Sequence, residues 1–168
     1  MDVGARLFIR DGPNTPSIVE VEKSSIVKGA DACGPYLLIP YEGSADAGDI
    51  EVELLVGLFF SYAVPRVLPA DAAPAPPGPP VLDRFRLQNS VTFTAVFGRN
   101  PLRGGIGSFD WPENGGDGCA VRIVGAGSGN VYRFSVEGGE EGVVDDLGNC
   151  MADHVRFYFK LIVEARER

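Results

Sequence analysis

The most regular pattern in this sequence is Ile50-Glu-Val-Glu-Leu-Leu-Val-Gly-Leu-Phe-Phe-Ser-Tyr-Ala-Val64, in which every even-numbered position is apolar. Successive side chains of a β-strand point to opposite faces of the sheet, so this period of two predicts a strand with one face in the core. Gly57 interrupts the pattern and predicts a bulge or bend. Leu55 and Phe59 make the second face apolar as well. Either the strand is central and covered on both sides, or Leu55 and Phe59 contact a partner.

The C-terminal segment 155–164 repeats this period of two. Its odd-numbered positions are apolar and share one face, whereas the other face is mixed and includes Ile162. A helix would mix the two sets, so the pattern predicts a second long strand. Shorter alternating segments predict further strands at positions 5–10, 19–22, 36–41, 84–87, 91–97, 119–123 and 132–137.

These segments amount to about nine strands, separated by turns rich in glycine, proline, asparagine and aspartate. Only weak helical patterns occur, at 145–153 and 70–73. Many strands with such turns predict an all-β fold, which we expect to be an antiparallel β-sandwich, jelly-roll-like, with little or no helix.

Seven of the 13 prolines fall between Pro65 and Pro80. Proline lacks a backbone donor, so this stretch predicts an extended arm or a loop and neither a central strand nor a helix. The part before it is too small to be stable alone. We therefore expect one domain over residues 1–168, with 65–80 as an internal loop or arm. An arm that lies over its own sandwich or a neighbouring one makes four of these prolines candidate contact residues: Pro76, Pro77, Pro79 and Pro80.

The composition argues against nucleic-acid and membrane partners. The net charge is −8 and the pI is about 4.6, whereas binding to phosphates requires a cationic surface. No apolar run reaches the roughly 18 residues of a membrane helix. The first residues lack the basic start and apolar block of a signal peptide. We expect a cytoplasmic protein, or a virion protein if the source is a virus.

No segment carries a complete catalytic motif. Val121–Asn130 looks like the start of a dinucleotide-binding unit, but the third glycine is missing and a strand pattern follows, which predicts a hairpin loop. Ser128 lacks the flanking glycines of a nucleophile elbow. For the single histidine, His154, the sequence identifies no nucleophile with which it could form a catalytic pair. We therefore expect no enzyme and assign no catalytic or cofactor-binding residue.

The sequence also assigns no metal site. The cysteines Cys33, Cys119 and Cys150 have no CxxC spacing and are expected to be small buried apolar residues. The acidic loops 110–117 and 140–146 offer oxygen ligands for calcium, but neither has an EF-hand pattern, so solvated turns are expected.

Phe109 and Trp111 lie in a glycine-rich loop, where an aromatic ring either binds a sugar or a partner or caps its own core. Taken together, the patterns favour a non-enzymatic structural or assembly protein. It would be an outer capsid, protrusion or decoration subunit of a virus-like particle that acts through symmetric contacts with itself or with a larger protein assembly. The alternative is a soluble binding module that uses the loop around Trp111 for a carbohydrate or protein ligand.

Overall fold

The computed structural model describes residues 2–10, 16–43, 45–59, 90–98, 104–110, 118–143 and 150–166. In this part of the chain there is no α-helix, and two short 3-10 turns cover Lys23–Ser25 and Ala47–Asp49. The strands are β1 (Asp2–Ile9), β2 (Ser17–Val21), β3 (Val27–Asp31), β4 (Gly34–Glu42), β5 (Ile50–Phe59), β6 (Val91–Phe97), β7 (Gly105–Asp110), β8 (Gly118–Gly127), β9 (Val131–Val136) and β10 (Val155–Arg166).

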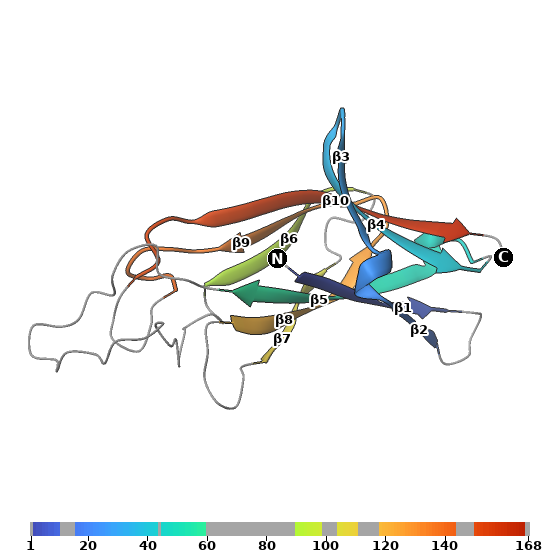
Figure 1. The fold of residues 1–168 in the computed structure, drawn as a ribbon, viewed down its shortest axis with the longest axis horizontal. Helices are drawn as coiled ribbons and strands as arrows, with labels where there is room; N and C mark the ends of the chain where they lie inside the picture. The colour runs from blue at the N-terminus through green and yellow to red at the C-terminus, as the bar shows by residue number, and fades with distance from the viewer. Residues whose placement is uncertain are drawn as a thin grey trace, which may run out of the picture.

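The strands form two sheets of five strands that face each other (Figure 1). Sheet A has the order β2-β1-β5-β8-β7, and sheet B has the order β3-β4-β10-β9-β6. This confirms the predicted all-β sandwich. The alternating patterns did not reveal β3 and β7, and the strand predicted at 84–87 lies outside the described residues. Each sheet contains strands from before and after the proline-rich stretch, and their buried side chains form one core.

One strand pair departs from the antiparallel prediction. β4 and β10 are parallel, with Leu37 opposite Leu161 and Ile39 opposite Val163, whereas the other described pairs are antiparallel. The alternation of apolar residues records the face of a side chain but not the direction of the neighbouring strand. The sequence pattern therefore contained no information on this pair.

The more specific expectation of a jelly roll is not confirmed. The order β1-β5-β8-β7 in one sheet and β10-β9-β6 in the other is that of a constant-type immunoglobulin sandwich, A-B-E-D against G-F-C. In this chain β2, β3 and β4 are added between the first two of those strands. The likeness is one of topology, and topology alone does not define a function.

The connection from β8 to β9 crosses from one sheet to the other, so the predicted hairpin loop within 121–130 was wrong. The hydroxyl of the fully buried Tyr132 holds this corner. It accepts hydrogen bonds from the Gly127 N–H at 2.8 Å and from the Asn130 side-chain amide at 3.0 Å. A tyrosine at this position, bonded to backbone a few residues upstream, resembles the tyrosine corner of immunoglobulin sandwiches. The side-chain contact thus agrees with the strand order.

The bulge in β5 does not lie at Gly57, where the sequence predicted it. Gly57 lies in the regular ladder, opposite Asp2 and Ala120. The register of β5 against β8 shifts between Val52 and Leu54, where two residues of β8 oppose one of β5. One of those two is Gly125, whose φ of 71° lies in the left-handed region that glycine adopts without a steric penalty. The position of a bulge depends on both strands, so the pattern of β5 alone was insufficient.

Candidate interaction surfaces

The outer face of sheet B carries a row of apolar side chains across three strands. In the register, Val27 of β3 lies opposite Leu38 of β4, and Leu38 lies opposite Ile162 of β10. Val27 is 44% exposed, and the other two are half-buried. We call these three residues the sheet-B row. Sequence reasoning selected only Ile162, because the pairing of β3 with β4 was not predicted.

Leu55 lies on the outer face of sheet A and is 42% exposed. Its neighbours across the strands are Gly4 and Arg122. Leu55 and Ile162 therefore lie on opposite outer faces of the sandwich, and the fold does not bring them together. Phe59 ends β5, and its side chain is outside the described part of the structure.

Phe109 lies in strand β7, so its predicted place in a loop was wrong; it is half-buried and packs against the core. Its position agrees with the capping role that the sequence left open. The remaining candidate contact residues lie outside the described residues: Trp111, Pro76, Pro77, Pro79 and Pro80.

An opening in sheet B lies where β4 separates from β10. β10 pairs with β9 along 155–160 and with β4 along 160–166. Within the described strands, residues 155–159 of β10 therefore have a neighbour on one edge only. The β3–β4 hairpin stands away from the sandwich near this point (Figure 1). We call the gap between this hairpin and residues 155–159 the β10 slot.

Inward-facing residues of β10 are exposed at the β10 slot. Leu161 and Val163, on the inner face, are 0% and 5% exposed, as the alternating pattern predicts. Val155 and Phe157 share that face but are 38% and 36% exposed. The described residues thus leave one end of the inner face of β10 incompletely covered.

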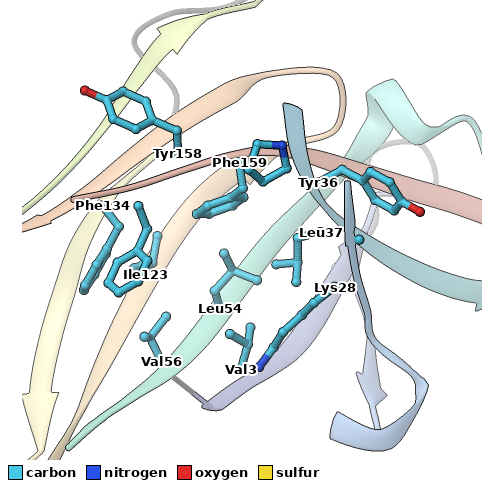
Figure 2. A pocket seen from close by; sticks show the side chains of 13 residues that line it. Val3, Lys28, Tyr36, Leu37, Leu54, Val56, Ile123, Phe134, Tyr158 and Phe159 are labelled. Carbon is cyan, nitrogen blue, oxygen red and sulfur yellow. The ribbon is translucent and has the colours of Figure 1, made fainter. Parts of the chain in front are cut away.

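The β10 slot contains a pocket of about 170 Å³ that reaches between the two sheets (Figure 2). Phe157 and Phe159 of β10 line one side, and Pro35 and Tyr36 of the hairpin line another. Its lining from sheet A consists of Val3, Leu54, Val56 and Ile123. The lining is apolar apart from Lys28 and the tyrosine hydroxyls. Sequence patterns gave no signal for this pocket, because it arises from a local separation of two strands.

Main-chain polar groups face the β10 slot. On the other edge of β10, the Leu161 N–H donates to the Asn130 carbonyl, and the Gly129 N–H donates to the Leu161 carbonyl. The N–H and C=O groups of a strand alternate between its two edges, so odd-numbered residues of β10 bond towards β9. The N–H and C=O groups of Arg156 and Tyr158 therefore point towards the slot.

Ser128 and His154, to which the sequence analysis assigned no catalytic role, are far apart and make structural contacts. The Ser128 hydroxyl accepts a hydrogen bond from the Val163 N–H, near the end of β10. His154 precedes the start of β10, and its Nδ1 lies 3.0 Å from the Gly138 nitrogen and 2.7 Å from a Glu137 carboxylate oxygen. Nine residues at about 3.3 Å each separate His154 from Val163 by roughly 30 Å. Ser128 and His154 therefore cannot form a catalytic pair.

The prediction for the cysteines was correct for one of the three. Cys119 is buried, whereas Cys33 and Cys150 are exposed. Burial raises the pKa of the Cys119 thiol to about 11. Cys33 is exposed because it lies in the turn of the β3–β4 hairpin, where its N–H donates to the Asp31 carboxylate at 2.8 Å. Within the described ranges, no group of three or more histidine, cysteine or acidic residues could hold a metal ion.

No protein-family model, no curated protein and no solved structure matches this chain. In the described part of the chain, no helix is long and apolar enough to cross a membrane.

Proposed function

We propose that this chain is a non-enzymatic structural subunit that works through contact with copies of itself or with a larger protein assembly. The observation that carries the proposal is the sheet-B row, an apolar cluster across three strands of one outer face; a single exposed apolar residue, Leu55, lies on the other outer face. Clustered apolar surface often marks a protein interface. Two faces that point in opposite directions let a subunit contact neighbours on both sides.

A more specific form of this proposal is an outer capsid, protrusion or decoration subunit of a virus-like particle. The net charge of −8 supports an outward position, since a surface that faces a nucleic-acid genome is expected to be basic. The size and the β-sandwich architecture support this form by analogy with viral coat and surface proteins.

The experiment is sedimentation of the purified chain over a range of concentrations, comparing the wild type with Ile162→Glu and Thr94→Glu. Thr94 is an exposed residue of β6 on the same outer face and serves as the matched control. We expect an oligomer that Ile162→Glu dissociates and Thr94→Glu leaves intact, because a charge within an apolar contact is costly to bury. A stable monomer that binds glycans would contradict the assembly proposal.

The second candidate is a soluble binding module for a carbohydrate or protein ligand. The observation that favours it is the β10 slot, which gives the domain a recess between its sheets. A screen of the purified protein against glycans tests the carbohydrate form of this candidate.

A further inference from the structure

We propose that the β10 slot binds an extended peptide strand of another protein, which pairs with β10 and places one apolar side chain between the sheets. This inference names a ligand class for the second candidate function and rests on it. It uses the slot and not the sheet-B row, so it can fail while the assembly proposal holds.

The first argument is the main chain of β10. Arg156 and Tyr158 direct their N–H and C=O groups into the slot, and β4 pairs with β10 only from Lys160 onwards. An added strand satisfies such groups with its own backbone, which is how many domains recognise extended peptides. Exposed strand edges are commonly protected by proline, a bulge or a charged side chain that points inward. Residues 155–159 have no proline, no bulge against β9 and no inward-pointing charge, and their one charged side chain, Arg156, lies on the outer face.

The second argument is the size of the pocket. A dry apolar cavity of about 150 Å³ can hold a benzene molecule. The pocket of about 170 Å³ therefore matches one leucine or phenylalanine side chain. Residues directly opposite each other on paired strands point to the same face of the sheet. The peptide residue opposite Phe157 would thus direct its side chain inward, against Phe157 and Phe159.

The third argument is the charge beside the slot. Arg156 and Lys160 lie on the outer face of β10, where the peptide residues flanking the apolar anchor also point. The Glu137 carboxylate near Arg156, at 3.8 Å, also contacts His154. Opposite charges on facing positions of paired strands are favourable. The ligand is therefore an extended segment with one large apolar residue between acidic ones.

The probe is an acetylated and amidated peptide, Glu-Thr-Glu-Phe-Glu-Thr-Glu, titrated into the full-length chain by calorimetry. We expect binding of one peptide per chain. Replacing the phenylalanine by glycine should weaken binding at least tenfold, and replacing the glutamates by lysines should also weaken it.

Two further peptides test for strand pairing. One is N-methylated on the two glutamates that flank the phenylalanine, and the other on the phenylalanine and both threonines. Only one edge of the bound peptide forms hydrogen bonds with β10, so methyl groups on the other edge leave binding intact. Only one of these two peptides should therefore bind. Which one binds shows whether the peptide lies parallel or antiparallel to β10. Equal binding of both would mean that the slot recognises a side chain alone, which overturns strand addition. Failure of the parent peptide to bind overturns the proposal, and the glycan screen then decides the carbohydrate form separately.

The protein variants are Tyr158→Pro and, as the matched control, Tyr158→Ala. Proline removes the N–H that faces the slot but none of the hydrogen bonds to β9, so the sheet should persist. The loss of one hydrogen bond should weaken peptide binding roughly fivefold. Alanine removes the same side chain, which lines the pocket, but keeps the N–H, so Tyr158→Pro should bind the peptide roughly fivefold more weakly than Tyr158→Ala. Equal affinities for folded Tyr158→Pro and Tyr158→Ala would contradict main-chain recognition.

Discussion

The tyrosine corner offers a sharp test of the fold, through the substitution Tyr132→Phe. The Tyr132 hydroxyl is fully buried and accepts hydrogen bonds from the Gly127 N–H and from the side-chain amide of Asn130. Its own proton points towards the Gly127 carbonyl at 3.5 Å. Removing the oxygen leaves two buried donors without their partner, and each costs about 1–3 kcal/mol. We expect the free energy of unfolding to fall by about 2–6 kcal/mol.

The matched control is Tyr41→Phe, which removes the same atom from a different environment. The Tyr41 hydroxyl donates one hydrogen bond, at 2.7 Å, to the carbonyl of Ala45, a half-buried residue. Water can replace that donor more easily, so the expected loss is about 0.5–1.5 kcal/mol.

Urea unfolding followed by circular dichroism measures both values. With a slope of about 2 kcal/mol per molar urea, a loss of 3 kcal/mol lowers the midpoint by about 1.5 M. In a thermal scan the same loss corresponds to a decrease of about 6–12 °C for a chain of this length. If Tyr132→Phe costs no more than Tyr41→Phe, the hydroxyl does not hold the connection between the two sheets and the reasoning is refuted.

Two further predictions concern Gly125 and the cysteines. Gly125→Ala should lower the free energy of unfolding in urea by about 1–2 kcal/mol, because φ is 71° at this residue. The control, Gly4→Ala, should change it little, because Gly4 has an ordinary φ and an added Cβ would make only ordinary contacts. Equal effects of the two substitutions would contradict the bulge assignment. A thiol reagent at pH 8 should label Cys33 and Cys150 quickly and Cys119 only in denaturant. The Cys119 thiol is buried and its pKa is raised to about 11, so it reacts slowly in the folded protein. Fast labelling of three thiols in the folded protein would contradict the burial of Cys119.

The sequence by itself determined the class of fold and most of its strands. In β1, β5, β9 and the second half of β10, the apolar residues that the patterns place on the inner face are buried or partly buried, although Glu53 and Ser135 on the outer faces are buried as well. This succeeds because the face of a side chain follows from its position along its own strand. β3, with the sequence Val-Lys-Gly-Ala-Asp, has no such pattern, and its pairing with β4 defines it.

Only the tertiary structure decided the order and direction of the strands, and with them the candidate sites. The parallel pairing of β4 with β10, the bulge at Gly125 and the separation of Leu55 from Ile162 each depend on a neighbouring strand. The exposure of Val155 and Phe157 has the same origin, because their alternating pattern predicts burial but β4 does not pair with β10 at their positions. The period of two thus determines which side chains face inward, whereas the neighbouring strands determine which of them are covered.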